Sequence, residues 1–179
     1  MGLNALNDAL KIQPNYPVGD DNEPTFTAPA NVPDIECFYT NFNAICEVTM
    51  LTGRDQWYNE GQPVMRHLRE FENQNKDKEN YCLFIAPRLH RDTINTFWMA
   101  VKYEYEGKPQ KIVPLSIENF IELLKTLRGL KQRGKFLKHA SLSNLYEQII
   151  STSRQFKDSS EWVQNIPTVI SSWKQIIEM

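Results

Sequence analysis

Two acidic residues in the first third of the chain have the type and spacing to bind a metal ion. Asp34 and Glu47 lie thirteen positions apart, at the outer ends of two short runs rich in β-forming residues, 34–39 and 44–49. A polar turn at 40–43 separates the runs, and this pattern predicts a β-hairpin. Because antiparallel pairing brings the start of one strand beside the end of the next, the two carboxylates should meet at one end of the hairpin.

Carboxylates held close together repel each other unless a cation lies between them. Hard oxygen ligands without histidine or thiolate suit Mg²⁺, for which Mn²⁺ can substitute. Strand alternation places Ile45, Glu47 and Thr49 on one face, and an acid that shares a face with an aliphatic residue favours a functional role. In the alternative interpretation, Asp34 is a turn residue and Glu47 simply faces solvent.

Composition limits the fold and the possible partners. With 179 residues, 41% of them hydrophobic, the chain can bury one good core with a helical annex. A net charge of −2 means that nucleic-acid binding must come from local patches or from a partner. No apolar run approaches the roughly 20 residues of a membrane span, and the start lacks a signal-sequence pattern. Cys37, Cys46 and Cys82 lack metal-ligand spacing and are interpreted as buried, reduced thiols of a cytoplasmic protein.

The hydrophobic pattern predicts an α/β fold, with a small mixed β-sheet flanked by helices and a C-terminal helical annex. We expect a core over residues 1–130 and a helical extension packed on it over 131–179. The expected elements, in order, are a helix at 3–11, a proline-rich loop at 13–33, the hairpin, a helix at 57–71 with Pro63 in its first turn, a solvated connector at 72–80, a strand at 81–86, a helix at 91–105, a strand at 111–115, and further helices from Ser116 onward.

Further residues could contribute to a site. His67 borders the apolar stripe of the 57–71 helix, where a histidine is either a packed core residue or a catalytic one. Because this helix follows the hairpin directly, the two are expected to be adjacent in space. The run from Lys125 to Lys138 is basic and contains no acid. It is either a solvated face or a contact for the phosphate backbone.

These residues carry a family resemblance. Pro33-Asp34 followed by Glu47-Val48-Thr49 resembles the PD-(D/E)xK nuclease superfamily, with Thr49 in place of the usual lysine. More narrowly, residues 31–127 resemble the cleavage domains of AlwI- and MlyI-like type IIS restriction endonucleases, which also occur in related nicking enzymes and in the small subunits of heterodimeric relatives. The segments that carry this resemblance are Glu47-Val48-Thr49, Thr52-Gly53-Arg54, Trp57, Glu60-Gly61 and Val64 to Leu68.

The resemblance implies a Mg²⁺-dependent endonuclease of a restriction-modification system, which hydrolyses one strand of double-stranded DNA with metal-activated water. The implied metal ligands are Asp34 and Glu47. The implied catalytic residues are Asp34, Glu47, Thr49, Glu60 and His67. Arg54, Arg66, Lys131, Arg133 and Lys135 are the candidate DNA contacts.

Two departures from the family pattern leave alternatives open. Such domains begin with a helix that bears another active-site glutamate, so this core is expected to be truncated at its N-terminus. The expected partners are therefore DNA, a DNA-recognition domain or large subunit, and a second cleavage domain. The alternative to a cleavage domain is a catalytically impaired dimerisation or DNA-docking module, which the missing glutamate and lysine favour. A repair or junction-resolving nuclease of the same fold is a third interpretation.

Overall fold

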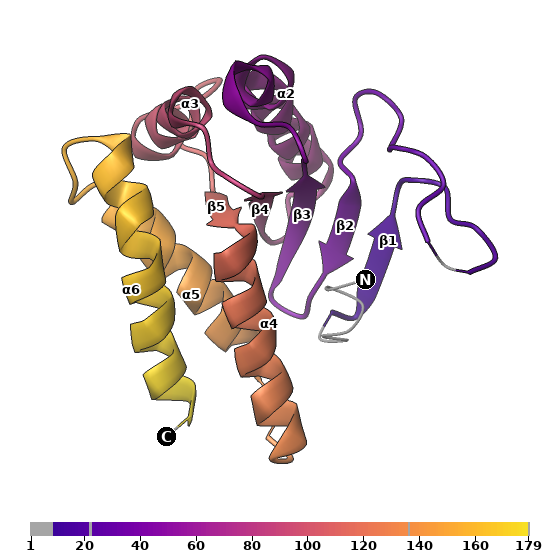
Figure 1. Cartoon of the computed structure of the whole chain (residues 1–179), viewed down its shortest axis with the longest axis vertical. Helices are drawn as coiled ribbons and strands as arrows, with labels where there is room; N and C mark the ends of the chain where they lie inside the picture. The colour runs from indigo at the N-terminus through magenta and orange to yellow at the C-terminus, as the bar shows by residue number, and fades with distance from the viewer. Residues whose placement is uncertain (1–8, 22, 136, 179) are drawn as a thin grey trace.

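A five-stranded mixed sheet organises the chain (Figure 1). The computed structural model describes residues 9–21, 23–135 and 137–178. The strands run in the order β1-β2-β3-β4-β5, in which β1–β2 and β2–β3 are antiparallel pairs and β3, β4 and β5 are mutually parallel. Their bounds are β1 Lys11–Pro14, β2 Ile35–Phe38, β3 Phe42–Val48, β4 Glu79–Ala86 and β5 Ile112–Ser116. The predicted α/β class with a small mixed sheet is confirmed.

Helices cover both faces of the sheet. Their bounds are α2 Gly53–Gln74, α3 Arg91–Lys102, α4 Ile117–Gln132, α5 His139–Thr152 and α6 Ser159–Glu178. Helices α2 and α3 connect successive parallel strands and pack against each other, whereas α4, α5 and α6 form a second group (Figure 1). The parallel strands are buried on both sides, which explains the near-continuous apolar sequence of β4.

Strand alternation decides which residues face which helices. Phe38 of β2 contacts Phe71 of α2, and Phe84 of β4 contacts Phe97 of α3. On the opposite face, Phe42 packs edge-on against Tyr146 of α5. The helices of the segment 131–179 contribute to the same hydrophobic core. The three cysteines are buried and unpaired, as expected, and burial raises the pKa of the Cys37 thiol to about 12.

The helix expected at 3–11 falls mostly outside the described residues, so most of it is untested. The loop expected at 13–33 was wrong at its start, because Lys11–Pro14 forms an edge strand. There Pro14 is tolerated because an edge position does not need its missing N–H. Helix α2 begins at Gly53, so that Pro63 lies in its interior and not in its first turn. The packing of Val64 and Leu68 on the sheet outweighs the one missing backbone hydrogen bond.

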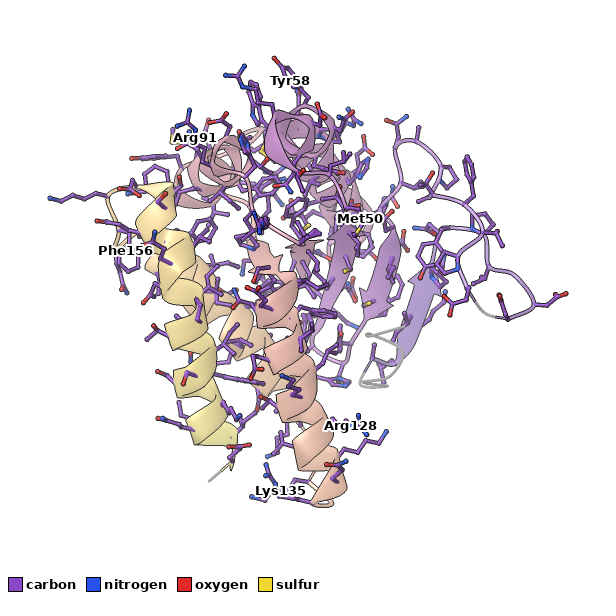
Figure 2. All side chains as sticks on the ribbon, viewed as in Figure 1. Met50, Tyr58, Arg91, Arg128, Lys135 and Phe156 are labelled. Carbon is purple, nitrogen blue, oxygen red and sulfur yellow. The ribbon has the colours of Figure 1, made fainter. Side chains whose placement is uncertain are left out.

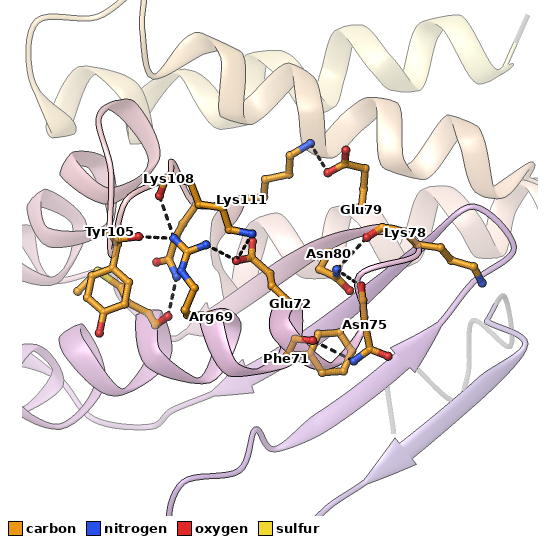
Figure 3. A network of polar contacts seen from close by, with 12 residues as sticks. Arg69, Phe71, Glu72, Asn75, Lys78, Glu79, Asn80, Tyr105, Lys108 and Lys111 are labelled. Atoms are coloured by element: carbon orange, nitrogen blue, oxygen red, sulfur yellow. Dashed lines mark hydrogen bonds and ion pairs between the residues drawn. The ribbon is translucent and has the colours of Figure 1, made fainter.

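The segment expected to be a solvated connector is partly buried. Glu72 lies in the last turns of α2 with only 8% of its surface exposed, and it accepts a 2.5 Å hydrogen bond from Arg69. The Arg69 guanidinium also donates to the backbone carbonyls of Tyr105 and Lys108 (Figure 3). This network ties the end of α2 to the turn between α3 and β5. Polar side chains can be buried there because each charge has a partner.

The Arg69–Glu72 pair should contribute strongly to stability, and the chain offers a matched control. Replacing Arg69 with Met leaves the Glu72 carboxylate with the Lys108 ammonium alone, 3.0 Å away, and removes the donor to the Tyr105 and Lys108 carbonyls. We therefore expect a loss of about 3 kcal/mol in the free energy of unfolding. Lys125 and Glu122 form an ion pair of the same i,i+3 spacing on the exposed face of α4. Lys125→Ala should therefore change stability by about 1 kcal/mol or less. Urea unfolding measures both, and equal losses would contradict this account of the network.

Candidate active site

The hairpin brings Asp34 and Glu47 together, as the sequence predicted from their spacing. Ile35 pairs with Cys46 across β2 and β3, which places Asp34 opposite Glu47. The backbone N–H of Asp34 donates to Glu47 Oε2 at 3.3 Å, and the backbone N–H of Val48 donates to Asp34 Oδ2 at 2.8 Å. Each carboxylate is thus held by the backbone beside the other. The two acids close one end of the hairpin.

Helix α2 adds two further side chains to this end of the sheet. His67 lies 2.8 Å from Glu47, measured from Nδ1 to Oε1. The Thr49 hydroxyl lies beside the carboxylate of Glu60, where it acts to lower the pKa of that group, and it accepts a hydrogen bond from the backbone N–H of Leu51. Glu60 and His67 are seven residues apart on one helix, which places them on the same face, two turns from each other. The structure therefore gathers all five sequence-predicted catalytic residues.

The electrostatics of the three acids favour a bound cation. Burial raises the pKa of Asp34, of Glu47 and of Glu60, and the charge of Asp34 raises the pKa of the other two further. Among the described residues, no lysine or arginine forms an ion pair with any of them. The positive influence that acts on all three pKa values comes from His67. Carboxylates with raised pKa values in one cluster are typical of functional sites.

The donor set fits a hard divalent cation. Asp34 and Glu47 offer carboxylate oxygens, and Mg²⁺ usually takes one or two carboxylates and completes its shell with water and substrate phosphate. Within the described part of the chain, no group of three or more His, Cys, Asp or Glu side chains is placed so that it could hold a metal ion. The candidate protein ligands are therefore the two carboxylates alone, and water and a substrate phosphate would have to complete the shell.

The predicted DNA contacts divide into two groups. Arg54 is exposed in the first turn of α2. Arg66 donates to Asn31 Oδ1 at 2.9 Å, in the loop that leads to Asp34. The other group lies far away. Arg128 and Lys135 of the basic run are at the opposite end of the molecule from Tyr58 and Arg91 (Figure 2).

Two of the distant basic residues have structural partners. Arg133 pairs with Glu178 at 3.0 Å, and Lys135 donates to the Glu178 backbone carbonyl. These contacts join the end of α4 to the end of α6. The structure therefore does not bring Lys131, Arg133 and Lys135 together with the carboxylates.

Sequence reasoning also missed a polar residue behind the site. Gln56 is fully buried and bonds to three backbone groups of the loops that follow β3 and β4. A glutamine one turn into a helix looks solvent-exposed in the sequence. Only its position between two loops shows that it is part of the framework of the site.

The raised pKa values lead to a prediction about stability. A carboxyl group with a raised pKa destabilises the folded state above that pKa, because it is more readily ionised in the unfolded chain. Glu47→Gln should therefore raise the Tm at neutral pH in EDTA by a few degrees, since 1 kcal/mol corresponds to about 2–4 °C in a domain of this size. The gain should shrink as the pH falls through the pKa of Glu47 in the folded state.

The same variant tests metal binding without any cleavage assay. Millimolar Mg²⁺ should raise the Tm of the unmodified protein, because a ligand of the folded state stabilises it. It should leave the Tm of Glu47→Gln unchanged. Differential scanning fluorimetry measures both effects, and an equal Mg²⁺ response in the two proteins would rule out Glu47 as a ligand.

Comparison with known proteins points to one family. A family model described as AlwI restriction endonuclease matches residues 1–123. Among solved structures, the fold resembles the small subunit of the heterodimeric restriction endonuclease R.BspD6I, with a TM-score of 0.72 and 19% sequence identity. That match covers 98% of this chain and 85% of the other. A search of curated proteins gives no significant match. Because the family model spans well over half of the 179 residues, the protein belongs to the AlwI restriction endonuclease family.

Proposed function

We propose that this protein is a Mg²⁺-dependent endonuclease, the cleavage domain or subunit of a type IIS restriction enzyme, which hydrolyses one strand of double-stranded DNA. The observation that carries the proposal is the meeting of Asp34 and Glu47 at one end of the hairpin, with Glu60, Thr49 and His67 around them. The family membership supports it. The pattern of acids is that of a PD-(D/E)xK site with threonine in the lysine position.

Each residue has a distinct task in this mechanism. Asp34 and Glu47 would hold a Mg²⁺, and a bound Mg²⁺ would supply an activated water and offset charge on the scissile phosphate. His67 holds Glu47 Oε1, so that Glu47 Oε2 stays directed toward Asp34. Glu60, beside Thr49, would help to bind a further cation or an attacking water.

Thr49 cannot carry the positive charge that lysine supplies in such sites. His67 is the basic side chain that acts to lower the pKa of all three acids. Its Nε2 is buried without a partner among the described residues. We therefore assign to His67 the electrostatic role of the missing lysine.

The partner that we propose for this chain is a large subunit. One similar solved structure is the small subunit of a heterodimeric enzyme, which supports this proposal. A mostly apolar pocket of about 330 Å³ opens beside Asp34, between the sheet, the start of α4 and the loop before β2. None of the helices in the described ranges is long and apolar enough to cross a bilayer.

The alternative is a docking module that does not cleave. The observation that favours it is the absence of any lysine or arginine ion pair at the acids within the described residues. Such a module would still contact DNA or a partner subunit. It would not depend on Asp34 for any chemical step.

A nicking assay separates these functions. Purified protein is incubated with supercoiled plasmid and Mg²⁺ or Mn²⁺, and conversion to open circles is measured on agarose gels. Asp34→Asn preserves size and removes the charge, so nicking should fall by a factor of 10² or more, because removal of one electrostatic interaction at a transition state typically costs about 10²–10³ in rate. Absence of nicking by the unmodified protein in both metals, alone and with its partner subunit, would support the docking module.

His67 has its own expected signature. His67→Ala should slow nicking by about 10²-fold, because both the charge and the hydrogen bond to Glu47 are removed. His67→Gln can still donate to Glu47 and should keep the Mg²⁺-dependent rise in Tm while most of the rate disappears. Full-rate cleavage by His67→Ala would remove this residue from the mechanism.

A further inference from the structure

A single buried amide connects the two loops at the carboxyl ends of β3 and β4. Gln56 Nε2 donates to the Leu51 carbonyl at 2.8 Å and to the Arg88 carbonyl at 2.9 Å, while Gln56 Oε1 accepts from the His90 backbone N–H at 2.8 Å. The residue is 0% exposed. All three partners are backbone groups. Gln56 therefore fixes the backbone path of both loops without using any of their side chains, which remain available to contact a ligand.

This connection places Arg88 at the edge that carries the acids. The Thr49 N–H donates to the Ile85 carbonyl, so the β3–β4 ladder extends to Thr49, the residue just after β3. Strand β3 carries Glu47. Arg88 follows Ile85 by three residues, in the loop held by Gln56. Its side chain is exposed and forms no ion pair with any described residue.

The cluster of acids explains why a positive side chain is useful at this edge. Asp34, Glu47 and Glu60 are gathered here, and the phosphates of DNA are negative as well. A DNA backbone that approaches this edge therefore meets repulsion from the acids. Exposed arginines are well suited to overcome it, because the planar guanidinium binds phosphate through two hydrogen bonds.

We propose that Arg88 binds a phosphate of the DNA strand beside the carboxylate site, and that Gln56 is the positioning residue that holds the Arg88 backbone for this contact. The ligand is the sugar–phosphate backbone of duplex DNA, bound without regard to sequence. The inference rests on the proposed nuclease function. It concerns binding, so it can be tested where no cleavage occurs.

The test measures DNA affinity in EDTA. Fluorescence anisotropy with a labelled duplex of about 30 base pairs, at KCl from about 50 to 200 mM, gives the slope of log K against log salt, whose magnitude is about 0.9 for each phosphate that the protein neutralises. Arg88→Ala should lower that magnitude by about 0.9 and weaken binding several-fold. Arg128→Ala is the matched control, since Arg128 is also an exposed arginine without an ion pair among the described residues. It lies at the opposite end of the molecule from Arg91, which begins α3 three residues after Arg88 (Figure 2).

The outcomes distinguish this inference from the proposed function. Three results would overturn the role of Arg88, even if plasmid nicking is observed. They are an unchanged salt slope for Arg88→Ala, an equal change of slope for Arg128→Ala, and no DNA binding by the unmodified protein at the lowest salt. An Arg88-dependent slope in a protein that never nicks would uphold the phosphate contact and refute the cleavage function.

Gln56→Met tests the positioning role separately. Removal of the buried hydrogen bonds should lower the Tm in any case, so the deciding measurement is the salt slope well below the Tm. If Gln56 acts through Arg88, Gln56→Met should lower the magnitude of the slope, and the double variant with Arg88→Ala should show no further change. A wild-type slope in Gln56→Met would limit Gln56 to a purely structural role.

Discussion

The reciprocal bonds between Asp34 and the end of β3 constrain the rest of the site. The Asp34 side chain accepts from the Val48 N–H, and the Asp34 N–H donates to the Glu47 side chain. These contacts form only if β2 and β3 pair in one register, because a slip of one residue would turn Glu47 to the other face. The hairpin thus fixes two carboxylates in a place where burial and mutual repulsion oppose their ionised forms. Natural proteins accept such local destabilisation where function requires it.

Helix α2 is the rigid support for everything that surrounds the two acids. Polar anchors hold it at both ends, Gln56 near its start and Arg69 with Glu72 near its end. Between these anchors, Val64 and Leu68 are buried against the sheet, while Glu60 and His67 point toward the acids. A helix fixed at two ends has little freedom to move relative to β3. Side chains seven residues apart can then keep their spacing to the hairpin.

The sequence predicted those parts of the structure that depend on local pattern. The hairpin, the buried strand β4 and the helices α3 and α4 follow from alternation, apolar runs and the Ser116 N-cap, which accepts from the Asn119 N–H. The proximity of Asp34 and Glu47 was predicted from antiparallel strand pairing alone. The features that were missed depend on tertiary contacts. Lys11–Pro14 is a strand only because β2 offers it an edge, and Glu72 is buried only because Arg69 and a distant turn reach it.

The candidate DNA contacts show the same limit of sequence reasoning. A run of basic residues is visible in the sequence, but whether it faces the acids depends on the direction in which α4 leaves the sheet. Helix α4 starts at the carboxyl end of β5 and runs away from that edge, so its last turns lie far from the end of the hairpin that carries the acids (Figure 1). Arg88 has no lysine or arginine within two residues in the sequence and gains its position only from the loop that Gln56 holds.

The charge arrangement bears on the choice between a nuclease and a docking module. A docking module gains nothing from keeping three carboxylates partly buried with raised pKa values, and neutral substitutions at those positions would make it more stable. A nuclease needs this arrangement, because the same repulsion that destabilises the isolated acids strengthens their hold on a divalent cation. In the proposed nuclease, Thr49 stands where a lysine is usual, so we assign the positive charge to His67 inside the site and to Arg88 beside it. One requirement is thus consistent with the buried acids, with His67 and with the loop that Gln56 holds. A phosphate and a cation have to reach the same end of the hairpin.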